Sequence, residues 1–254
     1  MNERSHDGER IADVDDGDAI ADVVEEAAED AAPGAPLVVE PHDPADPAVA
    51  RLVERARLLH DPWARLSPDA PISGDHVLNP DWHGDETPPP PREAAVLIAL
   101  AANAAGELGV ILTERASHLS AHAGQVALPG GKIEKGETPT MAALREAEEE
   151  VELPPGAVEP LGIFEAYLTR TNYMVVPVLA LVRERVTLRP HPGEVSEVFL
   201  APWSRVMDAA YRHERSYELE GRRRRFYETM VGDKSVWGVT AGIFKVVSER
   251  LYGP

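Results

Sequence analysis

The chain of 254 residues contains no cysteine, which excludes disulfide bonds and thiolate-ligated metal sites. It has no run of eighteen apolar residues either, so no transmembrane helix is expected. The N-terminal residues are acidic and lack the basic start and apolar stretch of a secretory signal. We therefore expect a cytoplasmic protein that does not associate with a membrane.

Basic and aromatic residues are scarce at the N-terminus. Residues 1–46 contain fifteen Asp or Glu and two Arg, a net charge of −13, whereas the rest of the chain contributes −6 to the total of −19. The first aromatic residue is Trp63. This composition predicts a disordered acidic tail over residues 1–46. The tail would bind a partner, increase solubility, or be disordered without a specific role. Because attraction to phosphate needs Lys and Arg, no nucleic-acid partner is expected.

Two further parts follow the tail. Residues 47–92 are predicted to form an N-terminal helix over 47–60, with Asp46 as its cap and Pro47 in its first turn, and then a proline-rich connector. Residues 93–254 are predicted to form the globular domain. Its strands and helices do not alternate regularly, which predicts an α/β fold with a mixed sheet between helices. Strands are predicted at 94–100, 109–113, 125–128, 158–168, 173–182 and 195–200, helices at 138–152, 204–211 and 240–251, and a hairpin at 217–220 and 226–230 around four arginines.

The helix predicted at 138–152 carries a cluster of carboxylates. At about 100° per residue, Glu146, Glu149 and Glu150 fall on one arc, opposite the apolar side of the helix. Glutamates three and four positions apart repel one another, so a cation should compensate them. Oxygen-only sites of this kind suit Mg²⁺ or Mn²⁺. The alternative is an ordinary solvated face, which is what most Glu-rich helices present.

The spacing around this cluster resembles the Nudix box. Gly131 is followed after five residues by Glu137, after seven more by Arg145-Glu146, and after two more by Glu149-Glu150. The resemblance implies a Nudix-type α/β/α sandwich and metal-dependent hydrolysis of a diphosphate. Glu152 departs from the pattern, because it stands where the family has a Gly that usually closes the helix in a left-handed cap.

The resemblance also implies roles for the residues of the box. Glu146 and Glu150, with Glu149 adjacent and Gly131 in the turn, would hold Mg²⁺ or Mn²⁺. Glu149 is the expected catalytic base, although in the family the base varies and can lie outside the box. Arg145 would orient the glutamates and pair with Glu137.

A second stretch, ILTERASHLSAHAGQVALPGG at residues 111–131, resembles the segment that marks the coenzyme A pyrophosphatase branch of the family. That branch would cleave coenzyme A or its derivatives to 3′,5′-ADP and (acyl-)phosphopantetheine. Arg115, Gly130 and Arg170 are the candidate contacts for this small-molecule diphosphate substrate. Ser120 replaces the second Arg of the pattern and Leu128 its Phe, which leaves other nucleoside diphosphate-linked substrates and nucleoside triphosphates open.

Other residues have two interpretations each. His118 and His122 would bind metal or phosphate, or serve a structural role. The arginines of Arg222–Arg225 would meet a 3′-phosphate or form a solvated hairpin tip, and Trp237 is expected in the core rather than against an adenine. A non-catalytic Nudix module that binds a nucleotide or a partner is the alternative from another functional class. The sequence leaves open whether the chain forms a homodimer.

Overall fold

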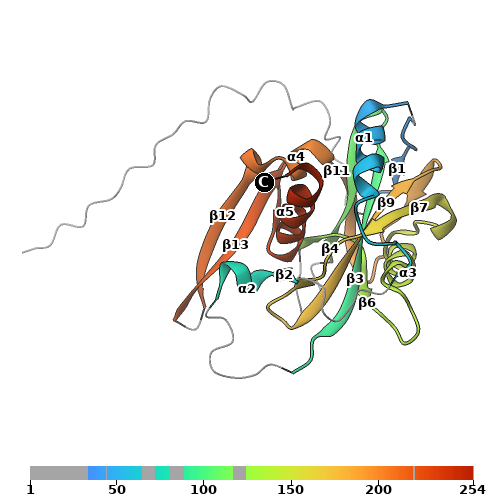
Figure 1. The fold of residues 1–254 in the computed structure, drawn as a ribbon. Helices are drawn as coiled ribbons and strands as arrows, with labels where there is room; N and C mark the ends of the chain where they lie inside the picture. Colours follow the sequence, from blue (N-terminus) through green and yellow to red (C-terminus); the bar gives the residue numbers. More distant parts are fainter. Residues whose placement is uncertain are drawn as a thin grey trace, which may run out of the picture. The chain divides into compact units, whose positions relative to one another are not determined.

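The computed structural model describes residues 34–43, 45–64, 72–80, 89–116, 124–219 and 221–253 (Figure 1). All of them belong to one compact unit, Ala32–Pro254. The helices are α1 (Pro47–Ala56), α2 (Asp75–Leu78), α3 (Pro139–Val151), α4 (Trp203–Met207) and α5 (Val239–Tyr252), with 3₁₀ turns at Pro155–Ala157 and Ala209–Tyr211. The strands are β1 (Leu37–Val39), β2 (Ser73–Gly74), β3 (Arg92–Ala102), β4 (Leu108–Arg115), β5 (Val126–Ala127), β6 (Gly130–Lys132), β7 (Val158–Ile163), β8 (Tyr167–Leu168), β9 (Tyr173–Val182), β10 (Val186–Leu188), β11 (Val195–Pro202), β12 (Arg212–Leu219), β13 (Arg222–Val231) and β14 (Lys234–Trp237).

The central sheet of the described residues is mixed, as predicted. Its main path runs β11-β4-β3-β9-β8-β2, with β5, β6 and β7 paired onto β4, β3 and β9. The long strands β3 and β9 run parallel, from Arg92 beside Tyr173 to Leu100 beside Leu181, whereas β4 pairs with β3 antiparallel. The fold class is therefore mixed α/β.

Both faces of the central sheet are buried, and this explains why β3 and β9 read as nearly continuous apolar runs. Successive side chains of a strand point to opposite faces. Ile98 and Leu179 lie in one hydrophobic core with residues of α1 and α5, whereas Leu97 and Val178 lie in another with residues of α3. Helices thus cover both faces of the sheet, which confirms the predicted α/β/α sandwich.

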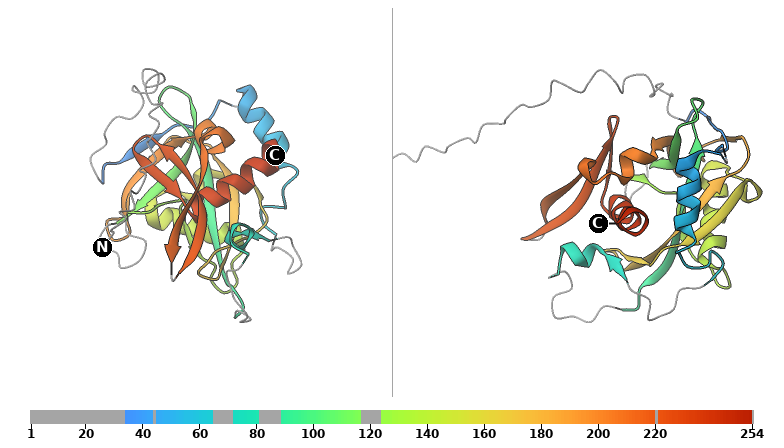
Figure 2. Two further views of the ribbon diagram at one scale, coloured as in Figure 1. Left: turned by 90° about the vertical axis from the view of Figure 1, so that its left-hand side faces the viewer. Right: turned by 45° about the horizontal axis from the view of Figure 1, so that its top comes forward.

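A three-stranded sheet adds a further layer beyond α5. Strands β12, β13 and β14 pair antiparallel in that order. Val236 of β14 is buried in the same core as Phe244 and Val247 of α5. Figures 1 and 2 show α5 between this small sheet and the central one. Within the described ranges, no helix combines the length and the apolar character needed to cross a membrane.

The two predicted helix starts are confirmed by their capping hydrogen bonds. The Asp46 side chain accepts from the backbone N–H of Ala48 at 2.8 Å, and the Thr138 side chain accepts from that of Met141 at 3.3 Å. Each cap is followed by a proline at the first helical position. Both signals act within one turn, so they can be recognised without knowledge of the tertiary structure.

The stretch expected to be disordered includes an ordered part. Strand β1 pairs antiparallel with β10, and Glu40 exchanges two backbone hydrogen bonds of 2.9 Å with Ala102. Val39 is fully buried. The apolar run at 37–39 finds a partner strand almost 150 residues away, and this pairing outweighs the acidic surroundings. The division of the chain at residues 46 and 92 stays a prediction.

Two other expectations were wrong in detail. The strand predicted at 158–168 is two strands, because residues 164–166 stand opposite only residues 176–177 of β9, between the pairs Ile163–Val178 and Tyr167–Val175. Residues 164–166 contain no glycine or proline that would signal this interruption. The hairpin of β12 and β13 is longer than predicted, and Arg222–Arg225 belong to β13 rather than to the turn. Four consecutive arginines read as a polar loop, but every one of them pairs with a residue of β12.

Candidate active site

The carboxylates of Glu146 and Glu150 lie at the Gly130–Gly131 turn. Strand β6 pairs with β3, which fixes this turn beside α3. The Gly130 N–H donates to Oε2 of Glu150 at 3.2 Å. A Cβ atom on Gly131 would lie 2.4 Å from Cδ of Glu146, so the absence of a side chain there lets the carboxylate approach the backbone. The turn and the helix thus bring together a glutamate pair, in which Glu150 is buried and Glu146 is half-buried.

This pair is electrostatically unfavourable by itself. Glu150 is 5% exposed, and burial raises its pKa to about 8, with added repulsion from Glu146 and Glu194. Burial also raises the pKa of Glu146, and the neighbouring Arg145 offsets this only in part. Desolvated carboxylates need a cation or a proton. Their oxygen-only chemistry therefore fits a divalent cation such as Mg²⁺ or Mn²⁺.

Arg145 holds the surroundings of the pair in place. Its Nε donates to Oε1 of Glu137 at 2.9 Å, and its Nη1 donates to Oε1 of Glu146 at 3.0 Å. Its Nη2 donates to the carbonyl oxygen of Lys132 at 3.1 Å. The guanidinium lowers the pKa of Glu137 through this hydrogen bond. The expected contact between Arg145 and Glu137 is present, and it fastens the loop before α3 to the helix.

Glu149 lies outside the glutamate pair. Its side chain is 59% exposed and accepts from Nη1 of Arg145 at 3.2 Å, which draws it outward. In the part of the chain that the structure describes, no three His, Asp or Glu side chains meet closely enough to enclose a metal ion. The expected cluster of three is therefore a pair. Because Mg²⁺ commonly takes one or two carboxylates and completes its shell with water and substrate phosphate, a pair remains compatible with the ion.

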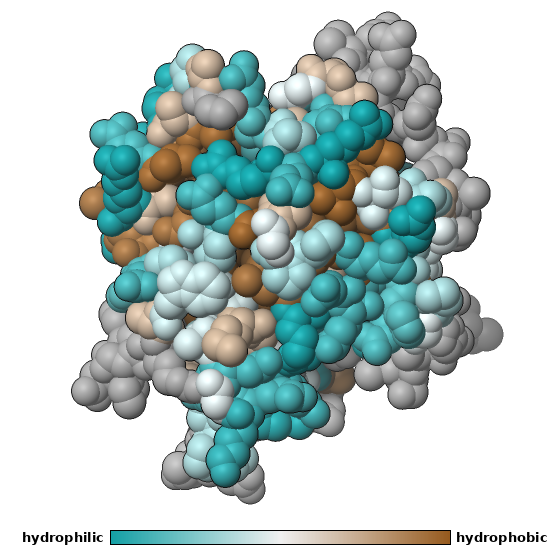
Figure 3. All heavy atoms as spheres, turned by 90° about the vertical axis from the view of Figure 1, so that its right-hand side faces the viewer, coloured by the Kyte–Doolittle hydropathy of each residue, from teal (hydrophilic) through white to brown (hydrophobic). Residues whose placement is uncertain are grey.

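The surface over α3 is polar. Glu148 and Glu149 are both exposed on this helix. Figure 3 views the molecule from the side on which α3 lies: hydrophilic side chains cover much of this face, and hydrophobic ones gather in the upper part of the view. An anionic substrate would therefore approach a polar surface.

Glu194 joins the site from the loop between β10 and β11. Within this loop the Arg189 N–H donates to the carbonyl of Val151 at 2.9 Å, and the His191 N–H donates to that of Glu150 at 2.8 Å. These two bonds satisfy carbonyls at the end of α3 that have no partner within the helix. Burial is the main cause of the raised pKa of Glu146 and Glu150, and the charge of Glu194 raises both further. Sequence reasoning missed Glu194, because nothing in its neighbourhood distinguishes it from a surface glutamate.

Arg115 reaches the same place from the end of β4. Its positive charge lowers the pKa of Glu150, although less than burial raises it. Its Nε is buried and has no hydrogen-bond partner among the described residues. The next residue, Ala116, donates its N–H to the carbonyl of Glu194 at 2.9 Å. A half-buried arginine beside the glutamates is suited to bind a phosphate oxygen.

Arg170 lies beside Asp75, and Trp237 lies outside the core. The Arg170 N–H donates to Oδ2 of Asp75 at 2.9 Å, and no described contact joins Arg170 to the glutamate pair, so its contact with a substrate stays a prediction. Trp237 is 37% exposed and packs edge-on with Phe226 at 5.4 Å between ring centroids, so the prediction that it lies in the core was wrong. Residues 117–123, including His118, Ser120 and His122, lie outside the described residues.

A family model and two similar sequences agree on one family. A model of the NUDIX domain matches residues 90–229. Nudix hydrolase 15, mitochondrial, from Arabidopsis thaliana is 40% identical over 169 residues, which are 64% of this chain and 59% of that protein. The uncharacterized Nudix hydrolase NudL of Escherichia coli O6:H1 is 39% identical over 161 residues, which are 63% of this chain and 83% of that protein. The crystal structure of the Nudix hydrolase RenU from M. smegmatis has a TM-score of 0.38 and 26% identity, over 45% of this chain and 73% of that one.

Proposed function

Because the chain belongs to the Nudix family, whose domain model covers more than half of it, we propose that it is a metal-dependent hydrolase of diphosphate linkages. We further propose that its substrate is coenzyme A or a derivative. The observation that carries the proposal is the pair of half-buried Glu146 and buried Glu150 against Gly130–Gly131, with Arg115 beside it. This arrangement would hold a divalent cation and one end of a diphosphate.

Each residue of the site would have one task. Glu146 and Glu150 would bind Mg²⁺ or Mn²⁺, with the turn at Gly131 as a further donor. When bound, the ion neutralises phosphate oxygens and lowers the pKa of a coordinated water. Arg145, tied to Glu137 and Glu146, would keep the carboxylates in position.

Two glutamates compete for the role of general base. Glu149 stays our first candidate, since it adjoins the pair and belongs to the box. The exposed position of Glu149 and its bond to Arg145 favour a second candidate, Glu194. The charge of Glu194 raises the pKa of both carboxylates of the pair, in addition to the larger effect of burial. Glu149→Gln and Glu194→Gln separate them: loss of the base would lower kcat by about 100-fold or more, whereas loss of a bystander would leave it nearly unchanged.

The substrate assignment depends on the segment at residues 111–131 and on Arg115. The positive charge of the half-buried Arg115, which acts on Glu150, favours a phosphate at this end of the site. Gly130 would let the substrate come close to the backbone. Arg170 stays a candidate for contact with the remainder of the substrate, although its backbone is engaged with Asp75.

Product analysis tests both parts of the proposal. The full chain is incubated with coenzyme A and Mg²⁺ or Mn²⁺, and water addition across the diphosphate should yield 3′,5′-ADP and phosphopantetheine. Glu150→Gln should abolish turnover while the circular dichroism spectrum stays unchanged. Retained turnover in this variant would contradict the role of the pair.

The rival substrates are sugar-linked nucleoside diphosphates and nucleoside triphosphates. A panel of these compounds at equal concentration separates the two proposals: hydrolysis of the panel without hydrolysis of coenzyme A would keep the reaction and reject the substrate. No hydrolysis with either metal would instead favour a non-catalytic Nudix module.

A further inference from the structure

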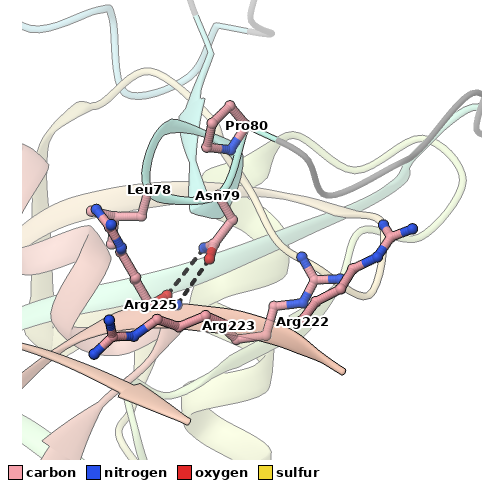
Figure 4. Close-up of a pocket in the computed structure, with 7 residues that line it drawn as sticks. Leu78, Asn79, Pro80, Arg222, Arg223 and Arg225 are labelled. Carbon is pink, nitrogen blue, oxygen red and sulfur yellow. Dashed lines mark hydrogen bonds between the residues drawn. The ribbon is translucent and has the colours of Figure 1, made fainter. Parts of the chain in front are cut away.

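A cavity of about 410 Å³ lies between the end of α2 and strand β13, away from the glutamate pair. It is lined by Leu78, Asn79 and Pro80 on one side and by Arg222–Arg225 on the other (Figure 4). This volume is typical of sites for small molecules, whereas long polyanions follow open grooves. The cavity therefore has the size of a small ligand.

The floor of the cavity is the free edge of β13. Strand β14 pairs only with Glu228–Val231, so the first half of β13 has no strand neighbour on that side among the described residues. Asn79 occupies part of this edge: its amide accepts from the Arg225 N–H at 2.8 Å and donates to the Arg225 carbonyl at 3.0 Å (Figure 4). These paired bonds fix α2 against the hairpin, so the cavity is held open by structure on both sides.

The cavity is strongly basic in a strongly acidic chain. Its described lining residues include four arginines and no Asp or Glu, where the whole chain carries a net charge of −19. Neighbouring strand residues alternate between faces, so each face of β13 presents two guanidinium groups beside the free edge. Such close like charges repel one another. An anion between them would remove this repulsion.

Protein groups satisfy Arg223, Arg224 and Arg225 only in part. Arg225 lies 3.6 Å from a carboxylate oxygen of Glu214, and Arg223 donates to the Ser216 hydroxyl at 3.0 Å. The Nε of Arg224 is buried and has no hydrogen-bond partner among the described residues. Because such donors are rare in folded proteins and cost free energy, the described part of the chain does not fully satisfy this guanidinium.

The cavity is separate from the glutamate pair. Strand β13 belongs to the small sheet on the α5 side, whereas α3 packs on the opposite face of the central sheet. Figures 1 and 2 show the hairpin and α3 on opposite sides of β3 and β9. A ligand here would not be the diphosphate that is hydrolysed at α3.

We propose that this cavity is a second binding site, for a small organic phosphate. The guanidinium groups of β13 bind the phosphate oxygens through charge-assisted hydrogen bonds, and Leu78 and Pro80 pack against the organic part. The proposal does not depend on the proposed hydrolysis, because the site shares no residue with the glutamate pair.

Isothermal titration calorimetry of the full chain with ADP, in the presence of EDTA, tests the proposed second site. Without a divalent cation the glutamates at α3 repel anions, so binding under these conditions reports on a cationic site. Arg223→Gln/Arg225→Gln should weaken ADP binding at least tenfold. The matched control Arg51→Gln/Arg57→Gln, which removes two exposed charges from the α1 region, should bind like the unmodified chain.

Three results would overturn the proposal: no ADP binding by the unmodified chain, equal binding by the β13 variant, or loss of binding through Arg115→Gln instead. If the double variant does not fold, Arg224→Gln replaces it, since the Nε that it removes makes no hydrogen bond with the described residues. Arg224→Gln should then weaken ADP binding. Inorganic pyrophosphate should bind more weakly than ADP. Equal affinity would refute the packing against Leu78 and Pro80.

Discussion

The carboxylate of Glu146 occupies the space where any residue other than glycine at position 131 would place its Cβ. That atom would lie 2.4 Å from both Cδ and Oε1 of Glu146. A glycine in the turn and a glutamate fifteen residues later in the helix are therefore one structural unit. The contact explains the need for glycine at this position by close approach rather than by backbone conformation.

Gly131→Ala should reduce hydrolysis with little loss of stability. The added methyl group meets the flexible end of Glu146, which can turn away, so the free energy of unfolding should change by less than about 1 kcal/mol. A displaced ligand group costs catalysis much more, on the order of 100-fold in kcat/KM for a shift of about 1 Å. Steady-state kinetics measure the expected loss of kcat/KM, and thermal unfolding of the same preparation measures the expected small change in stability.

Gly130→Ala is the matched contrast. Its Cβ would lie 2.3 Å from the carbonyl oxygen of Ala95, a backbone atom that cannot turn away. This variant should lose about 1–3 kcal/mol of stability through the strain on the pairing of β6 with β3. If both alanine variants had the same stability, the distinction between the two contacts would be wrong.

Arg145→Lys should lower kcat/KM about 10- to 100-fold. A lysine offers one ammonium group, which cannot bind Glu137, Glu146 and the Lys132 carbonyl together as the guanidinium fork does. Arg183→Lys is the control, because its ion pair with Glu159 lies on the surface and contributes little. Unchanged kinetics for Arg145→Lys would show that the loop before α3 does not need this anchor.

The stability of the metal-free protein should depend on the protonation of Glu150. The folded-state pKa of about 8 lies above the value of about 4.5 for a free glutamate, so folding favours the protonated form. This contribution is fully present below pH 4.5 and is lost as the pH rises through 8. In EDTA, the unmodified chain should lose about 3–5 kcal/mol more than Glu150→Gln between pH 4 and 9. Denaturant unfolding at several pH values measures the difference, and parallel curves for the two proteins would contradict it.

Glu152→Gly should stabilise the protein by about 0.5–1 kcal/mol. Glu152 ends α3 in the left-handed conformation, with φ of 55° and ψ of 34°, which strains a residue that has a Cβ. Glycine removes that strain at a smaller cost in the unfolded chain. The ion pair with Arg189 that is lost joins two exposed side chains 3.9 Å apart, so it contributes little. A lower melting temperature for this variant would refute the argument.

Elements whose structure depends on nearby residues were predicted from the sequence. The cap at Thr138, the proline after it and the apolar spacing fixed the extent of α3 to within a residue, since all three act within one or two turns. Strand β9 follows its continuous apolar run because both faces of it are buried. Strand β1 and the hairpin arginines escaped prediction, because their structure depends on partner strands that local composition does not reveal.

The features of the site also separate into those that local spacing determined and those that tertiary contacts determined. The sequence by itself determined that Glu146, Glu149 and Glu150 share a helix after a glycine turn, because helical periodicity depends on spacing alone. Tertiary structure decided which of them are buried, since Arg145 draws Glu149 to the surface while the turn covers Glu150. It also decided that Glu194 and Arg115 stand beside them, because strands β4 and β11 pair and bring distant parts of the chain to one end of α3.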